Sequence, residues 1–180
     1  MEMRRIILTG AHGTGKTTVL NLFKSAGYPT ITEVVRKLNK EKGVKINEQG
    51  DGEGQQAIFN EYFKLLGRQW DYVSDRGLTD VLAYTAYLVK HGQIDQSVYE
   101  AQLKLFKKFQ EENTDILYCF FPIEFEIEDD SVRSTKKEFQ REISDIIKHN
   151  LSICETQWIE VHGTPEERFR QILEMAGPNL

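Results

Sequence analysis

A glycine-rich segment near the amino end limits the folds open to this chain. The pattern G-x-x-x-x-G-K-[ST] runs from Gly10 to Thr17, and a short apolar, β-branched segment, residues 4–9, comes directly before it. Such a segment is typical of a buried parallel strand. The apolar helix pattern that follows completes the strand, loop and helix that this phosphate-binding motif, the P-loop, requires. We therefore expect nucleotide binding.

The residues of this loop each suit a phosphate group. Glycine at 10 allows a sharp turn, and glycines at 13 and 15 let backbone N–H groups approach phosphate oxygens. The positive end of the following helix points at the same anion. Lys16 is expected to reach the β- and γ-phosphates of ATP, and Thr17 to ligate Mg²⁺. His12 is expected to be a variable loop residue rather than a catalyst. The expected ATP contacts are Gly10, Ala11, His12, Gly13, Thr14, Gly15, Lys16, Thr17 and Thr18.

Composition narrows the class of protein. The chain has 180 residues, 39% hydrophobic and 28% charged, which predicts one domain over residues 1–180. A net charge of −5 argues against a surface built wholly for nucleic acid and leaves a local basic groove open. Cys119 and Cys154 form no zinc motif. Without an apolar run that could span a bilayer, or room for a signal peptide, we expect a cytoplasmic protein with no membrane contact.

Apolar segments alternate with helical patterns along the chain. Strands are expected at 4–9, 29–32, 70–74, 115–121 and 158–161. Helices are expected at 16–26, 34–42, 55–69, 78–90 and 97–113, then around 139–151 and from 165, with a polar loop over 47–54. This alternation predicts a three-layer α/β sandwich with about five parallel strands and helices on both faces.

Several polar residues follow predicted strands. In such sheets, ligands bind at the carboxyl ends of the strands. The loop from Gly10 to Thr17, Glu33, the pair Asp75-Arg76 and the segment 122–133 all occupy such positions. We expect them to converge on one cleft.

With these motifs the chain resembles the P-loop nucleoside and nucleotide kinases. This group includes thymidylate kinases, deoxynucleoside kinases and small AAA-type ATP-binding domains related to nicotinamide riboside kinases. The resemblance covers nearly the whole chain. It implies the strand order 2-3-1-4-5 and transfer of the γ-phosphate of ATP, with Mg²⁺, to a nucleoside or (deoxy)nucleoside monophosphate. Relatives with this architecture are often dimers, so a homodimer is an expected possibility.

The resemblance also implies roles after the third strand. Arg76 would bind the acceptor or the transferring phosphate, and Asp75 would contact Mg²⁺ through water or act on the acceptor. An arginine fork beside a carboxylate suits charge that builds on phosphoryl oxygens. A surface salt bridge at a strand end is the alternative interpretation of this pair.

Glu33 falls where deoxynucleoside kinases carry a glutamate, which would take a proton from an acceptor hydroxyl. The family's usual proline is replaced by Val34, and a carboxylate favoured by the helix dipole is the alternative. Arg36 lies one helical turn on and would suit a phosphorylated acceptor, as in thymidylate kinases. The expected acceptor contacts are thus Glu33, Arg36 and Arg76.

A lid segment at about 122–142 is the last implied element. Arg133 and Arg141 would close over ATP, stabilise the transition state and exclude water. A solvated charged loop is the alternative. Of the aromatic residues expected near the acceptor, Phe59, Tyr62, Phe63 and Tyr84, most should be core and one could stack on a base.

Other functions remain open at this stage. A D-x-x-G pattern over 51–54 lacks a preceding strand and no N-K-x-D motif follows, which argues against a GTPase. A kinase acting on nucleic acid, at a hydroxymethylated base or a strand end, could use the basic residues of 36–45 and the lysines at 104, 107 and 108. A non-kinase P-loop ATPase or switch is the remaining alternative.

Overall fold

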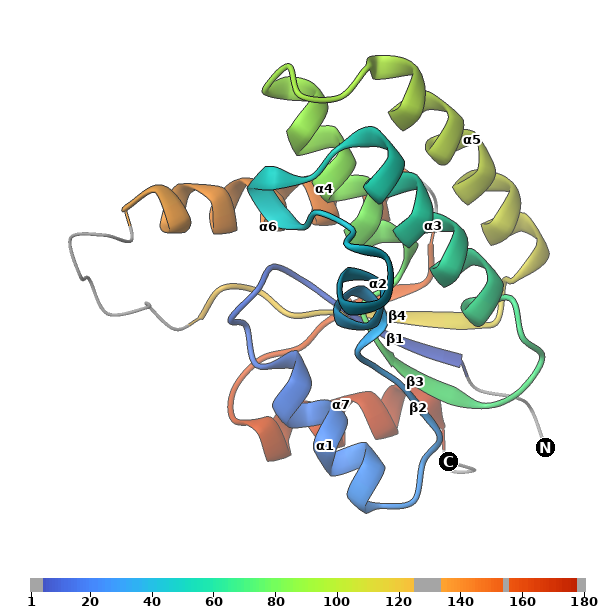
Figure 1. The fold of residues 1–180 in the computed structure, drawn as a ribbon. Helices are drawn as coiled ribbons and strands as arrows, with labels where there is room; N and C mark the ends of the chain where they lie inside the picture. The colour runs from blue at the N-terminus through green and yellow to red at the C-terminus, as the bar shows by residue number, and fades with distance from the viewer. Residues whose placement is uncertain (1–4, 125–133, 154–155, 178–180) are drawn as a thin grey trace.

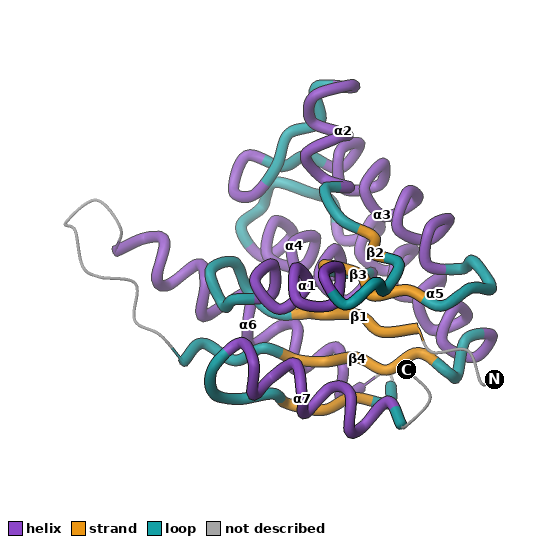
Figure 2. The backbone as a smooth tube through the Cα atoms, turned by 90° about the horizontal axis from the view of Figure 1, so that it is seen from below, coloured by secondary structure: helices purple, strands orange, loops and turns teal. Residues whose placement is uncertain are grey.

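The sheet has the predicted architecture. The computed structural model describes residues 5–124, 134–153 and 156–177. Five strands form one sheet in the order β2-β3-β1-β4-β5, and every neighbouring pair is parallel. Figure 2 shows this sheet face on, with its strands side by side. The strands are β1 (Arg5–Thr9), β2 (Thr30–Ile31), β3 (Tyr72–Asp75), β4 (Ile116–Phe120) and β5 (Trp158–Glu160).

Helices cover both faces of the sheet (Figure 1). On one face α1 packs against α7, and on the other α4 packs against α3, α5 and α6. The short α2 lies beside α3, near the β2 edge. None of the described helices is long and apolar enough to cross a bilayer. The helices are α1 (Lys16–Ser25), α2 (Val34–Lys42), α3 (Gly52–Leu66), α4 (Leu78–Lys90), α5 (Gln96–Glu112), α6 (Ser134–Ile153) and α7 (Pro165–Ala176), with a 3₁₀ turn η1 (Asn47–Gln49).

Two apolar cores explain why the central strands are nearly unbroken hydrophobic runs. On β1, Ile6 and Leu8 belong to the core beneath α1 and α7, whereas Ile7 belongs to the core beneath α3 to α6. Cys119 and Tyr118 divide in the same way on β4. Because both faces of these strands are buried, residues that point to either face are apolar, and the sequence shows no alternation of polar and apolar residues. This two-sided burial made the strands detectable in the sequence.

The start of α3 corrects one expectation. Residues 47–54 were expected to be loop throughout, but η1 occupies Asn47–Gln49 and α3 begins at Gly52. The side chain of Asp51 caps this helix by accepting a hydrogen bond of 2.9 Å from the backbone N–H of Gly54. A Cβ on Gly54 would lie 3.2 Å from Cγ1 of Val44, so this glycine permits close packing. In the sequence, a glycine that a helix needs for close packing cannot be distinguished from a glycine that marks a loop.

The carboxyl ends of the strands lie at one edge of the sheet. The glycine-rich loop connects β1 to α1, and Asp75 ends β3. The segment after β4 begins beside the loop, because the N–H of Phe121 donates to the carbonyl of Thr9 at 2.9 Å. This arrangement is the convergence that the parallel topology predicts.

Candidate active site

The glycine-rich loop adopts a backbone that requires its glycines. Gly10 has φ 144°, and a Cβ there would lie 2.6 Å from the carbonyl oxygen of Phe121. Gly13 and Gly15 also have positive φ, 73° and 90°. The close approach excludes a side chain at Gly10, and positive φ favours glycine at all three positions. Within the loop, Ala11 and Thr14 are buried, and Thr18 lies exposed on the first turn of α1.

Lys16 lies folded into this loop. It is 4% exposed, and its Nζ donates to the carbonyl oxygens of Gly10 and Ala11 at 2.7 and 2.6 Å and to Oγ1 of Thr14 at 3.2 Å. Burial, together with the smaller effect of the positive charge of Arg76, lowers the pKa of Lys16 to about 7. A bound anion would supply the opposite charge that this ammonium group lacks in the loop.

Thr17 and Asp75 meet beside the loop. The Thr17 hydroxyl donates to Oδ2 of Asp75 at 2.9 Å. The other carboxylate oxygen, Oδ1, is buried and has no hydrogen-bond partner among the described residues. A hydroxyl and a carboxylate are hard oxygen ligands, the kind that Mg²⁺ binds together with phosphate oxygens. These two residues fit the predicted Mg²⁺ site on this donor set.

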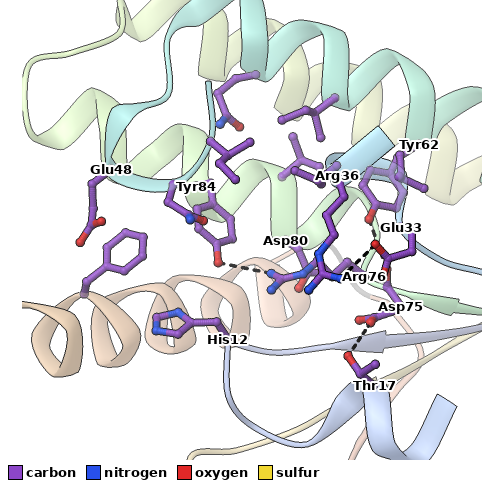
Figure 3. Close-up of a pocket in the computed structure, with 18 residues that line it drawn as sticks. His12, Thr17, Glu33, Arg36, Glu48, Tyr62, Asp75, Arg76, Asp80 and Tyr84 are labelled. Atoms are coloured by element: carbon purple, nitrogen blue, oxygen red, sulfur yellow. Dashed lines mark hydrogen bonds and ion pairs between the residues drawn. The ribbon is translucent and has the colours of Figure 1, made fainter. Parts of the chain in front are cut away.

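A cavity of about 550 Å³ opens next to this pair (Figure 3). Its polar wall includes Thr17, Glu33, Arg36, Asp75 and Arg76, which come from three separate segments of the chain. Its apolar wall is made by side chains of α2, α3, α4, α6 and the loop after α2, namely Val34, Val35, Ile46, Ile58, Tyr62, Val81, Tyr84 and Phe139. A volume of this size lies within the range of small-molecule sites, which combine an apolar wall with placed polar groups.

Glu33 and Arg36 lie at the start of α2 and interact with each other. Nη1 of Arg36 donates to the two carboxylate oxygens of Glu33 at 3.1 and 3.2 Å. Both side chains are largely exposed and line the cavity. The two side chains therefore lie together where α2 begins, beside the cavity.

Arg76 contacts an aromatic side chain of the cavity wall. Its Nη1 donates to the hydroxyl of Tyr84 at 3.3 Å, and its guanidinium lies 5.7 Å from the centre of that ring (Figure 3). The Tyr62 hydroxyl donates to the backbone carbonyl of Asp75 at 3.2 Å. Arg76 thus forms a contact with an aromatic wall rather than an exposed salt bridge at the strand end. Of the four aromatic residues expected near the acceptor, Tyr62 and Tyr84 line the cavity, and Phe59 is core.

Backbone strain marks the same cavity. Among the residues that the structure describes, three other than glycine have positive φ: Glu33 at 61°, Asn47 at 56° and Arg76 at 77°. All three line the cavity. Such conformations are unfavourable and gather at functional sites, where the surrounding structure maintains them.

Asp80 is a site residue that sequence reasoning missed. It is 2% exposed and lies on α4, one turn after Arg76. Its carboxylate accepts hydrogen bonds from the Thr9 hydroxyl at 2.8 Å, the Gly77 N–H at 3.0 Å and the Gly10 N–H at 3.3 Å. Burial raises the pKa of Asp80. An acidic residue within an otherwise apolar helical stretch was the signal that could have revealed it.

His12 and α6 form the far wall. The His12 ring stacks on Phe139 with centroids 5.7 Å apart, and Nε2 of Gln140 donates to the His12 carbonyl at 2.6 Å. Phe139 also meets the edge of Tyr84 at 5.8 Å. Two residues of α6, Phe139 and Gln140, therefore contact the glycine-rich loop at His12.

Of the two expected lid arginines, the structure describes only Arg141, and this residue does not line the cavity. Arg141 lies on α6 and lines a separate hollow of about 440 Å³, together with Glu124, Lys148 and Glu160. Arg133 lies outside the described residues, as does all of 125–133 in the expected lid segment.

Comparison with known proteins places the chain in a family. A family model described as an AAA domain matches residues 5–168. No curated protein sequence matches the chain.

Solved structures share the fold. A NadR protein in complex with NAD and AMP-PNP superposes with a TM-score of 0.70 at 14% identity over 99% of this chain and 51% of that chain. Deoxyadenosine kinase from M. mycoides with bound dATP gives 0.63 at 13% identity over 98% and 100%. YorR protein from Bacillus subtilis, in complex with phosphorylated GDP, gives 0.59 at 18% identity over 94% of each chain. The chain spans about half the length of the NadR chains. At these identities the likeness establishes the fold.

Proposed function

The chain belongs to the AAA-domain family with a P-loop nucleoside and nucleotide kinase fold, and we propose that it transfers the γ-phosphoryl group of ATP to a nucleoside or a (deoxy)nucleoside monophosphate. Support comes from the likeness in fold to proteins solved with such ligands. NadR was solved with NR, and deoxyadenosine kinase with dATP.

One observation carries the proposal. The 550 Å³ cavity adjoins Thr17 of the glycine-rich loop and bears a carboxylate, Glu33, and two guanidinium groups, Arg36 and Arg76, on its wall. A small molecule in this cavity would present its reacting oxygen close to the end of a triphosphate held by the loop. Proximity of this kind supplies most of the catalysis in phosphoryl transfer.

ATP and Mg²⁺ fit the residues present. Lys16 and the backbone N–H groups of the loop would hold the phosphates, and Thr17 and Asp75 would hold the metal ion. When bound, Mg²⁺ neutralises charge on the β- and γ-phosphates.

Glu33 and the arginines have distinct roles in the proposed transfer. With a hydroxyl acceptor, Glu33 takes the hydroxyl proton while the acceptor oxygen bonds to the γ-phosphorus. The bond from that phosphorus to the bridging oxygen breaks, and ADP leaves with the electron pair. Lys16 and Arg76 stabilise the charge on the transferring group. With a monophosphate acceptor an ionised phosphate oxygen attacks, and Arg36 binds that phosphate instead.

ADP release with ATP–Mg²⁺ tests the proposal. The panel comprises nucleosides, nucleoside monophosphates, nicotinamide riboside, and DNA with and without hydroxymethyluracil. We expect acceptor-dependent ADP release with a member of the first three groups. Release that is independent of every acceptor would identify an ATPase. Release stimulated by DNA alone, with binding that weakens steeply as salt is added, would identify a nucleic-acid kinase. The reactants are cytoplasmic metabolites, so the proposal also places the protein in the cytoplasm.

A further inference from the structure

A buried arginine from the opposite end of the chain touches the glycine-rich loop. Arg168 lies on α7, which packs against α1 (Figure 1), and it is 2% exposed. Its Nη1 donates to the backbone carbonyl of Thr14 at 2.6 Å, across 154 positions of sequence. Its Nη2 pairs with Oε2 of Glu124 at 2.6 Å. The guanidinium group also lies 5.2 Å from the centre of the Phe121 ring.

This contact fixes the direction of one peptide unit of the loop. A trans peptide is planar, so the carbonyl of Thr14 and the N–H of Gly15 point in opposite directions. Arg168 holds the carbonyl toward α7, and the Gly15 N–H therefore points away from α7. A Cβ on Gly15 would lie 3.4 Å from Nη1 of Arg168, which shows how closely the two groups pack. Arg168 thus orients the Gly15 N–H donor without itself contacting the ligand.

Glu124 holds the arginine in place. Besides pairing with Arg168, its carboxylate accepts from the Gly163 N–H at 3.0 Å and interacts with the ring of His162. Burial alone would raise the pKa of Glu124, but the hydrogen bonds from Arg168, Gly163 and His162 hold it below its usual range. The carboxylate is therefore ionised at neutral pH. A buried guanidinium needs such a partner, because an unpaired buried charge is strongly destabilising.

We propose that Arg168 is a positioning residue for the triphosphate site, acting through the Thr14–Gly15 peptide and held by Glu124. The inference rests on the proposed function only in that the loop binds a triphosphate. It does not depend on which acceptor occupies the cavity.

Binding of inorganic tripolyphosphate and of ATP–Mg²⁺, measured by titration calorimetry, tests this role. Arg168→Met should weaken both ligands by about 10- to 100-fold, the range for loss of a hydrogen bond to a charged group. Arg168→Lys, which keeps the charge, should recover part of the loss. Arg170→Gln is the matched control, because Arg170 is exposed on the same helix and its Nε donates to the Glu166 carbonyl at 3.4 Å, away from the loop. Its affinities should equal those of the wild type.

The outcomes separate positioning from a purely structural role. A structural role would lower the Tm of the ligand-free protein and leave the dissociation constants, measured well below that Tm, unchanged. That result would overturn the inference. If Arg168→Met does not fold, Glu124→Gln takes its place, and an unchanged affinity for tripolyphosphate in that variant overturns the inference equally. If the wild type binds neither ligand, the proposed function fails together with the inference.

Discussion

The hydroxyl of Thr17 donates a hydrogen bond of 2.9 Å to Oδ2 of Asp75 and so joins the first turn of α1 to the end of β3. The two residues are 58 positions apart in the sequence. Their meeting brings the proposed metal ligands to one point beside the cavity that bears Glu33 and Arg76.

Asp75→Asn should raise the Mg²⁺ concentration needed for half-maximal turnover by about 10- to 100-fold, because an amide oxygen is a weaker ligand for a hard cation than a carboxylate. ADP release measured over a Mg²⁺ titration checks this. Asp71→Asn is the control, since Asp71 lies exposed just before the same strand, at its other end. An unchanged Mg²⁺ midpoint in Asp75→Asn would remove this residue from the metal site.

Lys16→Met should abolish binding of ATP and make the ligand-free protein more stable at pH 7. The pKa of Lys16 falls from 10.5 to about 7 on burial. Between these values the unfolded chain binds more protons than the folded chain, so this lysine makes the free energy of unfolding rise with pH over that window. Methionine removes that contribution. Urea unfolding of both proteins is measured without nucleotide or metal at pH 7, 8 and 9. The difference between their free energies of unfolding should become smaller as pH rises. Parallel pH profiles would contradict the prediction.

Glu33→Gln should lower kcat with a hydroxyl acceptor by about 10²- to 10⁴-fold, the usual contribution of a general base. Stability should be nearly unchanged, because the Glu33–Arg36 pair is exposed. Glu41→Gln, an exposed glutamate near the end of the same helix, provides the comparison. Steady-state kinetics and thermal melts measure both effects. A fall of less than about threefold would assign Glu33 a structural role at the helix start.

Arg36→Gln separates the two acceptor classes. If the acceptor is a monophosphate, its KM should rise by about tenfold, because a charged hydrogen bond to phosphate is lost. The KM for the corresponding nucleoside should stay the same. KM values for a matched nucleoside and monophosphate, in wild type and variant, provide the measurement. Equal changes for both would show that Arg36 does not bind the acceptor phosphate.

Asp80→Asn should lower the free energy of unfolding by about 1–3 kcal/mol, because –NH₂ replaces one carboxylate oxygen and cannot accept from the backbone N–H group, of Gly10 or Gly77, that this oxygen satisfies. The carboxylate joins Gly10 of the loop to Gly77 beside Arg76, so kcat should fall as well. Urea denaturation and ADP release measure the two effects. Wild-type stability would show that the buried network rearranges without cost.

The sequence by itself determined the sheet and the phosphate loop. β1 and β4 were detectable because burial on both faces leaves a local, unbroken apolar pattern. The loop was detectable because the close approach at Gly10 requires glycine and the positive φ of Gly13 and Gly15 favours it, so the glycines recur at fixed spacing within a few residues.

Only the tertiary structure decided which side chains support that loop and line the cavity. Asp80, Gln140 and Arg168 contact it across 70, 128 and 154 positions of sequence. Their contacts depend on how the two helical layers pack on the sheet. That packing cannot be predicted from the spacing of residues that are neighbours in the sequence. Backbone conformation and strand burial are local properties, whereas partners brought together by layer packing are not.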